Sequence, residues 1–449
     1  MSKPNILFLL IDGLRADKFY GNTKTSKTQN LDSLIRKGTY FEQAISPADG
    51  TFLTLNSIFN SVFPFVTGVR TRKLVFTQSN YLMNLINFGY HLYGIVPQLT
   101  SLNSLIKLFE NENNAYSAEP PNVLHLHDGL GRQIVDMLEF KKMIEPWFYY
   151  VHINDLHWPL EVPSQYDSTN FGISKYEKII SSIDYWIGKI LEKTDLQNTL
   201  VIITSDHGSL IPVGDKEVTY FEPRLNFGSN IGKQIMPKAF SSIGYKSIFF
   251  LRKIIAKIRL AKANYNLSRY EKRSRLPYFT LSLFDESIRV PLLLVGFGIT
   301  SKVVKQQVCS VDIFPTIAEL IQMSTNNITR IHGKSFRPLL EEKKLDEYPI
   351  YLHTIPYEQI SPNDKVGIRT SRYKYFRMSH NPKREIHLYD LKNDPYENIN
   401  IAKKHPDIIT KMEKILIDIQ KETNQEKNDS KEEDEDKKIR EELKKLGYI

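Results

Sequence analysis

The sequence predicts an α/β protein in which a large, mostly parallel central sheet is flanked by helices and followed by a small C-terminal α+β subdomain. Apolar runs of strand length alternate with segments of helical periodicity along most of the chain, which is typical of parallel strands joined by helices. The run at residues 6–11 is continuously apolar, as expected for a strand buried on both faces. From about residue 348, short strands separated by polar turns take over.

The predicted elements of the main α/β part follow in chain order. The first strand, residues 6–11, ends in Asp12, and the loop at residues 46–50 leads into a helix that starts at Thr51. An amphipathic helix is expected at residues 174–193, with apolar side chains on one face. The other expected elements are a helix at 30–38, strands at 147–153, 200–204 and 291–295, and a helix that opens at 311–316.

The C-terminal part is predicted to form a small antiparallel sheet closed by a helix from about residue 406. Its strands are expected around Tyr351 and at 366–369, 373–376 and 388–391. We therefore expect three parts. They are a main domain at 1–345 with a basic, partly helical insert at 210–279, a C-terminal subdomain at 346–420, and a mixed-charge tail at 421–449.

Composition and charge restrict the class of protein. The chain of 449 residues is 41% hydrophobic and 25% charged, which is ordinary for a soluble globular protein. Its single cysteine, Cys309, allows no intrachain disulfide and fits a reducing compartment. The first apolar run is too short for a signal peptide, and no uncharged stretch is long enough to span a bilayer. We therefore expect a cytoplasmic protein, with peripheral contact to the inner membrane face as an option.

The formal net charge of +9 favours anionic partners such as phosphate or sulfate esters, acidic glycans or a membrane surface. No aromatic-plus-basic recognition motif accompanies it, so nucleic acid is not expected. Within the insert, apolar residues recur at helical spacing over 248–261, with Arg252, Lys253, Lys257 and Arg259 between them. Such a basic amphipathic helix is typical of a membrane or acidic-polymer contact, and a lid helix with solvated lysines is an equal alternative.

Three strand ends and one helix start carry residues that can take part in catalysis or bind a metal ion. The strand ends carry Asp12, His157 and the pair Asp206-His207, and Thr51 opens the helix. Carboxyl ends of parallel strands meet at one sheet edge, where ligands bind. Carboxylates, imidazole and a hydroxyl at that edge would form a metal-assisted nucleophile site. The structural alternatives are a turn-capping Asp12, a helix N-cap role for Thr51 and a hydrogen-bonded strand-end role for His157.

The chain resembles the sulfatase family, within the alkaline phosphatase superfamily, over about residues 4–420. The resemblance lies in an ordered series of individually weak motifs. These are found at residues 5–17, 30–41, 152–159, 205–208, 285–291, 311–316, 333–335, 368–370 and 388–395.

The sequence departs from the family at the reacting centre. Thr51 occupies the position of the Cys or Ser that is oxidised to formylglycine, and Leu55 replaces the arginine of that motif. Gly13 stands where many members have a second acidic ligand, and no lysine lies near residues 94–98. Phe279-Thr280 fills the place of a substrate histidine. In these respects the chain is more similar to phosphate-transferring and phosphate-cleaving relatives that use an unmodified Thr or Ser.

The resemblance implies a metal-dependent hydrolase or transferase in which Thr51 attacks a phosphate or sulfate ester. It implies one divalent ion (Ca, Mn, Mg or Zn) held by Asp12, Thr51, Asp206 and His207, with His157 protonating the leaving group. We expect a phosphate ester in preference to a sulfate ester, because threonine lacks the second hydroxyl that expels sulfate in sulfatases.

The substrate is expected to be an anionic ester linked to a glycan or a lipid, and phosphodiesterase and phosphoglycerol- or phosphoethanolamine-transferase activities fall within this class. A sulfuric ester hydrolase is the alternative, and an inactive member that binds an anionic glycan or a membrane is the alternative of another class. Three further residues are expected to be mainly structural. His152 lies within an apolar run, Arg289 precedes a buried strand, and Arg369 could reach an anion but is not assigned to the site.

Overall fold

The computed structural model describes residues 3–67, 73–77, 80–119, 122–139, 142–211, 265–274, 282–325, 328, 331–354 and 363–421. The chain divides into two compact units, one formed by Met1–Ser209 and Leu281–Ile449 and the other by Leu210–Thr280. In the second unit, Ser268 and Glu271 form a capping box at the start of helix α10 (Arg269–Arg273). The predicted basic helix at 248–261, the pair Phe279-Thr280 and the tail from 422 lie outside the described residues.

The first unit is built on an eight-stranded sheet with the order β10-β2-β9-β7-β1-β6-β4-β5. Strand β1 lies inside the sheet and pairs in parallel with β6 and β7. Only β9 runs antiparallel to its neighbours, β2 and β7, among the described strands of this sheet. In sheet order the strands are Lys302–Val304, Thr39–Phe41, Leu292–Gly296, Thr199–Thr204, Asn5–Ile11, Trp147–Ile153, His91–Pro97 and Ala115–Tyr116.

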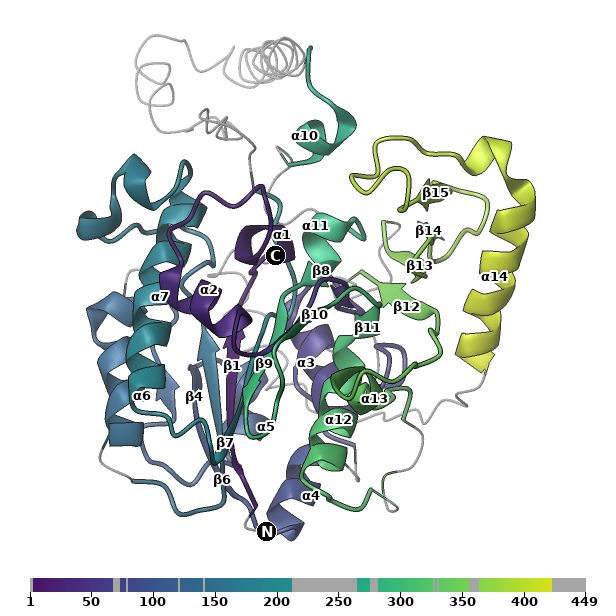
Figure 1. Cartoon of the computed structure of the whole chain (residues 1–449). Helices are drawn as coiled ribbons and strands as arrows, with labels where there is room; N and C mark the ends of the chain where they lie inside the picture. Colours follow the sequence, from purple (N-terminus) through teal and green to yellow (C-terminus); the bar gives the residue numbers. More distant parts are fainter. Residues whose placement is uncertain are drawn as a thin grey trace, which may run out of the picture. The chain divides into compact units, whose positions relative to one another are not determined.

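Helices cover both faces of this sheet (Figure 1). Helices α2 (Gln29–Ile35), α6 (Leu130–Glu139) and α7 (Lys175–Glu192) pack together on one side. On the other side lie α3 (Thr51–Asn60), α4 (Tyr81–Asn87), α12 (Ile313–Leu320) and α13 (Arg337–Leu340).

Strand β1 is buried along its whole length because both of its faces are covered. Alternate side chains of a strand point to opposite faces, and Ile6, Phe8 and Leu10 enter the main hydrophobic core together with residues of α3, α4 and α12. This burial on both faces confirms the interpretation of the first apolar run. The polar residue that follows the strand is thereby delivered to the carboxyl edge of the sheet.

A four-stranded antiparallel sheet with the order β12-β13-β14-β15 follows in the C-terminal part. Helix α14 (Pro406–Lys421) packs on this sheet through Met412 and Leu416, which join its hydrophobic core. The strands are Ile350–His353, Lys365–Arg369, Tyr373–Met378 and His387–Asp390. The predicted fold class is therefore confirmed, whereas the predicted domain boundaries stay predictions.

The remaining described elements are short. A three-stranded sheet consists of β11 (Val308–Cys309), β3 (Ala44–Ile45) and β8 (Arg289–Val290). The short α-helices are α1 (Ala16–Phe19), α5 (Asn103–Ile106) and α11 (Asp285–Ile288). The 3₁₀ helices are η1 (Thr100–Leu102), η2 (Leu126–Asp128), η3 (Ser164–Tyr166), η4 (Thr169–Phe171), η6 (Ser310–Asp312) and η7 (Ala402–Lys404).

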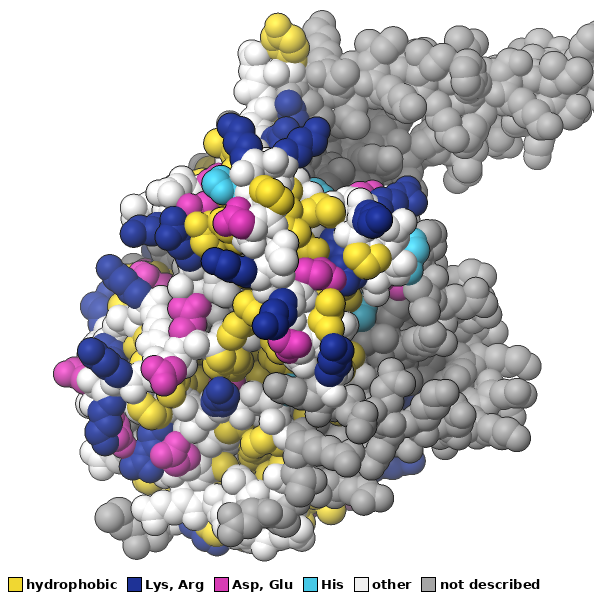
Figure 2. Space-filling view, turned by 90° about the vertical axis from the view of Figure 1, so that its right-hand side faces the viewer, with side chains coloured by type: hydrophobic (Ala, Val, Ile, Leu, Met, Phe, Trp, Pro, Cys, Tyr) yellow, Lys and Arg dark blue, Asp and Glu magenta, His cyan; other side chains and the backbone are white. Residues whose placement is uncertain are grey.

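Charges of both signs lie on the surface. Figure 2 shows one face on which Lys and Arg side chains are interspersed with Asp and Glu over much of the described surface. Within the described ranges, none of the helices combines the length and apolar character that a membrane span requires.

Candidate active site

Asp12 lies at the carboxyl edge of the large sheet because it directly follows β1. Its N–H donates to the carbonyl of Ile153 at 2.9 Å, which continues the pairing with β6 for one residue. The side chain is only 2% exposed. The next residue, Gly13, adopts a φ of +68°, a left-handed conformation that glycine accepts without strain. The chain therefore turns away immediately and leaves the carboxylate at the strand end.

Asp206 and His207 follow β7, the strand on the other side of β1. One carboxylate oxygen of Asp206, Oδ1, accepts hydrogen bonds from the backbone N–H groups of Gly13 at 3.1 Å and His207 at 2.8 Å. The N–H of Gly13 thus contacts Asp206 at the place where the family resemblance puts a second acidic ligand. In the ring of His207, Nδ1 donates to the carbonyl of Gly208 at 2.7 Å. That bond orients Nε2 toward Asp12 and Asp206.

Thr51 is the first residue of α3, and Gly50 is the N-cap residue of that helix. The Thr51 hydroxyl therefore makes no cap hydrogen bond, and the N-cap alternative is wrong. Instead Oγ1 donates to Oδ2 of Asp12 at 3.2 Å and lies 3.3 Å from Nε2 of His207. All of α3 is buried, which holds the hydroxyl in place. The four residues expected to bind a metal, Asp12, Thr51, Asp206 and His207, are thus brought together.

The cluster has the donor set and spacing of a divalent cation site. Ligand atoms of Asp12, Asp206 and His207 lie within 4.8 Å of one another, and all three residues are buried. Oδ1 of Asp12 and Oδ2 of Asp206 are buried and have no hydrogen-bond partner. A buried carboxylate oxygen without a partner is costly, and a cation between these oxygens would remove that cost. The residues present therefore fit a metal ion.

The charged groups of the cluster shift one another's pKa values. Burial opposes ionisation of Asp12, but the neighbouring His152, His207 and His157 hold its pKa well below the usual range. Burial also opposes protonation of His207, yet the Asp206 and Asp12 carboxylates raise the pKa of His207 above its ordinary value. The two carboxylates thus favour a positive charge on the His207 imidazole, which would also be a ligand of a bound cation. A proton and a metal ion should therefore compete for this site.

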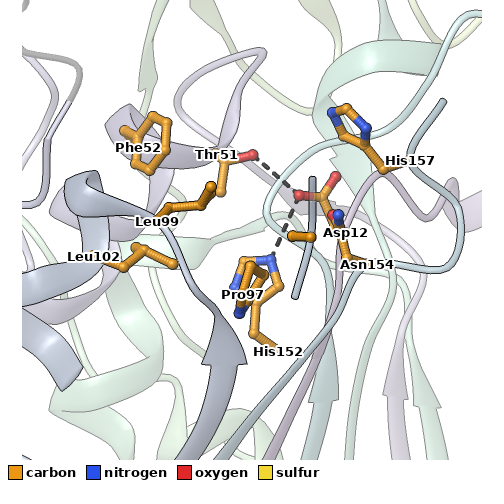
Figure 3. A pocket seen from close by; sticks show the side chains of 10 residues that line it. Asp12, Thr51, Phe52, Pro97, Leu99, Leu102, His152, Asn154 and His157 are labelled. Atoms are coloured by element: carbon orange, nitrogen blue, oxygen red, sulfur yellow. Dashed lines mark hydrogen bonds and ion pairs between the residues drawn. The ribbon is translucent and has the colours of Figure 1, made fainter. Parts of the chain in front are cut away.

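A pocket opens beside the cluster (Figure 3). Thr51 and His152 both point toward Asp12, whereas Phe52, Leu99 and Leu102 form an apolar side. Pro97 lies within residues 94–98, where the family resemblance places a lysine. The residues that line the pocket are Asp12, Thr51, Phe52, Pro97, Leu99, Leu102, Ala118, His152, Asn154 and His157, and none of these described residues is a lysine or an arginine.

His157 lies in the turn after β6 and lines the pocket, as the sequence predicts. Its Nδ1 donates to the carbonyl of Trp158 at 2.9 Å, which orients the ring. The side chain is buried, and burial lowers the pKa of His157 although the Asp12 carboxylate opposes this shift. A protonated His157 would therefore give up its proton readily.

His152 contributes more to the site than the sequence indicated. It is buried within β6, as expected for a core histidine, but its Nε2 lies 3.5 Å from Oδ2 of Asp12. Its Nδ1 lies 3.2 Å from the hydroxyl of Tyr150. Because β6 pairs with β1, His152 lies next to Leu10 in register. The strand alternation that places Tyr150, His152 and Asn154 on one face was the signal that could have identified it.

Two arginines and one leucine have structural roles. Arg369 makes a bidentate ion pair with Asp285, with N–O distances of 3.1 and 2.9 Å. Arg289 lies 3.8 Å from the same carboxylate. Leu55 is fully buried in the main hydrophobic core, so an apolar side chain occupies the position of the sulfatase arginine. None of these three side chains lines the described pocket.

Fold and site together define a class, namely an α/β protein with a buried carboxylate–imidazole cluster and a helix-borne hydroxyl at the carboxyl edge of its sheet. Residues 4–323 match the Sulfatase family, and residues 278–444 match the family described as N-sulphoglucosamine sulphohydrolase, C-terminal. The first match covers most of the chain. The chain therefore belongs to the sulfatase family, which confirms the resemblance.

Known relatives match parts of this sequence. The N-acetylgalactosamine-6-O-sulfatase of Bacteroides thetaiotaomicron is 24% identical over 289 residues, which cover 61% of this chain and 47% of that enzyme. Other curated relatives are covered over 32% and 27% of their length. This chain thus aligns with about half or less of each of these relatives.

Two solved structures with low sequence identity share the fold. The structure of Ps i-CgsB in complex with k-i-k-neocarrahexaose superposes with a TM-score of 0.66, 16% identity and 98% coverage of both chains. The phosphonate monoester hydrolase of Agrobacterium radiobacter gives a TM-score of 0.64 at 14% identity, with coverage of 94% of this chain and 96% of that one.

Proposed function

We propose that this chain is a metal-dependent ester hydrolase of the sulfatase family that attacks a phosphoric ester with the hydroxyl of Thr51. The observation that carries the proposal is the position of Thr51 Oγ1, 3.2 Å from Asp12 and 3.3 Å from His207, within a buried ligand cluster. A hydroxyl nucleophile needs a nearby proton acceptor or a cation to become reactive. Asp12 accepts the hydrogen bond from Thr51, which meets the first need.

The metal would be held by Asp12, Asp206 and His207, with Thr51 beside them. When bound, the ion would stabilise the anionic oxygens of the ester and lower the pKa of the hydroxyl. The N-terminus of α3 adds partial positive charge near Thr51, because N–H groups of the first helical turn have no partner within the helix.

The reaction is proposed in two steps. Asp12 accepts the proton of the Thr51 hydroxyl while the Thr51 oxygen forms a bond to phosphorus, the bond from phosphorus to the alcohol oxygen breaks, and His157 gives its proton to that oxygen. Water then attacks the phosphothreonine and passes a proton to His157. The bond from phosphorus to the Thr51 oxygen breaks, and Asp12 returns its proton to that oxygen, which releases phosphate and restores the Thr51 hydroxyl. The lowered pKa of His157 makes its protonated form a stronger acid and lowers the fraction of His157 that is protonated at neutral pH, and these two effects oppose each other in the first transfer.

Phosphate is favoured over sulfate for two reasons. Threonine has a single hydroxyl, so the phosphate or sulfate on a Thr51 ester cannot be expelled by a second oxygen on the same carbon. It must be attacked by water or by an alcohol, as in phosphoryl-enzyme chemistry. In addition, the described pocket-lining residues include no lysine or arginine, so the basic side chains that the family resemblance places in a sulfatase site are missing from this pocket. Attack by an alcohol in place of water would make the same site a transferase.

A sulfuric ester hydrolase is the second candidate, because the relative from Bacteroides thetaiotaomicron is named a sulfatase. We propose a glycan-linked ester as the substrate class, since the structural neighbour Ps i-CgsB was solved in complex with k-i-k-neocarrahexaose. An inactive, purely binding member is less well supported, because the buried Asp12, Asp206 and His207 cluster has no evident use in a protein that only binds a glycan or membrane.

The test is a matched panel of nitrophenyl phosphate, bis-nitrophenyl phosphate and nitrophenyl sulfate, assayed with Mg²⁺, Mn²⁺, Ca²⁺ or Zn²⁺ and with a chelator. We expect metal-dependent phosphate ester cleavage that exceeds sulfate release and is lost in Thr51→Val. Metal-dependent sulfate release that exceeds phosphate release and depends on Thr51 would favour the second candidate. Absence of turnover on all esters and all metals would support an inactive member.

A further inference from the structure

Two groups of metal-ligating side chains occur among the described residues. One is the active-site cluster, and the other consists of His125, His127 and Asp128. These three residues lie around η2, which ends at Gly129 with a φ of +118°. The sequence predicts a single divalent ion held by Asp12, Thr51, Asp206 and His207, and the second group lies outside that set.

The second group has a geometry suited to a metal ion. The rings of His125 and His127 are nearly parallel, with an angle of 12° and centroids 5.6 Å apart. Asp128 reaches both rings, with Oδ2 lying 3.1 Å from Nδ1 of His125 and Oδ1 lying 3.4 Å from Nε2 of His127. In a tetrahedral zinc site with bonds of about 2.0–2.1 Å, neighbouring ligand atoms lie about 3.4 Å apart. The observed spacings are close to that value.

Hydrogen bonding within the chain does not fully satisfy this group. Nδ1 of His127 is buried and has no hydrogen-bond partner. Asp128 can offer one oxygen to each imidazole, but the second nitrogen of His127 stays without a partner. His125 is 4% exposed, and in the described structure its ring contacts Asp128 and the stacked ring of His127. A cation bound between the three side chains would replace the contacts of Asp128 with Nδ1 of His125 and Nε2 of His127.

The turn is held in place by a buried carboxylate of the strand edge. The N–H of Leu126 donates to both oxygens of Asp155, at 3.1 and 3.4 Å. Asp155 follows β6, two residues before His157, and is 3% exposed. The backbone between the two histidines is thereby fixed to the same strand end that carries His157. Ligands on a backbone held this way need little reorganisation on binding.

We infer that His125, His127 and Asp128 form a second divalent metal site, separate from the catalytic cluster and selective for zinc-like ions. Two imidazoles and one carboxylate suit Zn²⁺ better than Ca²⁺ or Mg²⁺, which prefer oxygen ligands. Three protein ligands leave a coordination position for water or a substrate oxygen. His125 also lines a pocket shared with His157, Trp158 and Glu161. This pocket adjoins the reaction pocket, with which it shares Ala118, Asn154 and His157.

The test measures zinc binding by the full chain after chelator treatment, with a chromogenic chelator as competitor. Asp206→Ala together with His207→Ala removes the catalytic cluster, so that any remaining tight site is the second one. We expect this variant to bind one zinc equivalent. Adding His125→Ala and His127→Ala should weaken its affinity at least 100-fold. Unchanged affinity, or no zinc equivalent in the starting variant, would overturn the proposal.

Two further variants separate a specific loss of zinc binding from misfolding. Asp128 is 45% exposed at its side chain, so Asp128→Asn, added to the variant that carries Asp206→Ala and His207→Ala, should fold normally and still weaken zinc binding at least tenfold. His91→Ala removes a different imidazole, paired with Glu110, and should leave zinc affinity unchanged. Equal effects of both substitutions would contradict a specific site. Because no readout uses turnover, the result is independent of the proposed ester hydrolysis.

Discussion

The hydroxyl of Thr51 lies 3.3 Å from Nε2 of His207, although the two residues are 156 positions apart in the chain. Thr51 begins a helix, and His207 follows a strand at the centre of the sheet. Their meeting joins the proposed nucleophile to a proposed metal ligand, and Asp12 completes the contact from the neighbouring strand end. The predictions below test this arrangement and the packing that supports it.

Thr51 is tested by a matched pair of substitutions. Thr51→Val keeps the shape of the side chain but removes the hydroxyl, and we expect at least a 1,000-fold loss of kcat on the preferred ester. Thr51→Ser keeps the hydroxyl and should retain activity within about tenfold. Steady-state kinetics on both variants provide the measurement. Equal activity of the Val and Ser variants would show that another group attacks the substrate.

We expect the buried carboxylate of Asp206 to lower the free energy of unfolding when no metal is bound. Its Oδ2 is buried and has no hydrogen-bond partner, so Asp206→Asn should leave the chelator-treated protein as stable as wild type, or more stable by about 1–3 kcal/mol. Divalent ions should raise the Tm of wild type but not of this variant. Thermal unfolding with and without chelator measures both effects. A metal-induced shift of equal size in the two proteins would argue against Asp206 as a ligand.

His157 should matter most for esters with poor leaving groups. An alkyl alcohol needs protonation as it departs, so His157→Ala should lower kcat on an alkyl phosphate by about 100- to 10,000-fold. Nitrophenolate leaves without a proton, and its ester should lose less than about tenfold. The ratio of the two losses serves as its own control. Similar losses on both esters would assign His157 to substrate binding instead.

Asp285 joins the C-terminal sheet to the body of the first unit. It binds Arg369 in bidentate fashion and Lys374 at 2.7 Å, and both cations are almost fully buried. Asp285→Ala should lower the free energy of unfolding by about 3–5 kcal/mol, because it leaves the buried guanidinium of Arg369 without its carboxylate, whereas Lys374 keeps its ion pair with Glu397 at 2.7 Å. Asp167→Ala, which breaks an exposed pair with Lys178, should cost less than about 1 kcal/mol. Denaturant titrations compare the two, and equal costs would contradict the prediction.

Asp312 should make stability depend on pH. Burial raises its pKa to about 7, whereas an aspartate in the unfolded chain titrates near about 3.9. Between these values the folded state binds a proton that the unfolded state lacks, so the free energy of unfolding falls as pH rises. The slope reaches at most about 1.4 kcal/mol per pH unit and levels off above pH 7.

Asp312→Asn should remove this part of the pH dependence, and Asp418→Asn, on the exposed face of α14, should not. Denaturant unfolding at pH 5, 6, 7 and 8 provides the measurement. An unchanged slope in Asp312→Asn would show that another group titrates.

Local pattern was sufficient for much of the fold and for the core of the site. A continuous apolar run identifies a strand buried on both faces, and a polar residue directly after it must lie at the sheet edge. This argument located Asp12 and Asp206-His207. The loop before the helix located Thr51. Family membership and fold class followed from the same ordered motifs, and both were confirmed.

Only the tertiary structure decided which side chains from distant parts of the chain contact one another. His152 was expected to be a core histidine, and its approach to Asp12 depends on the register between β6 and β1. Arg369 could have reached an anion, but Asp285 from a distant helix holds it. The pairing of His125 with Asp128 depends on a turn anchored by Asp155. Contacts between distant segments are set by packing and register, which a single sequence does not encode in any local pattern.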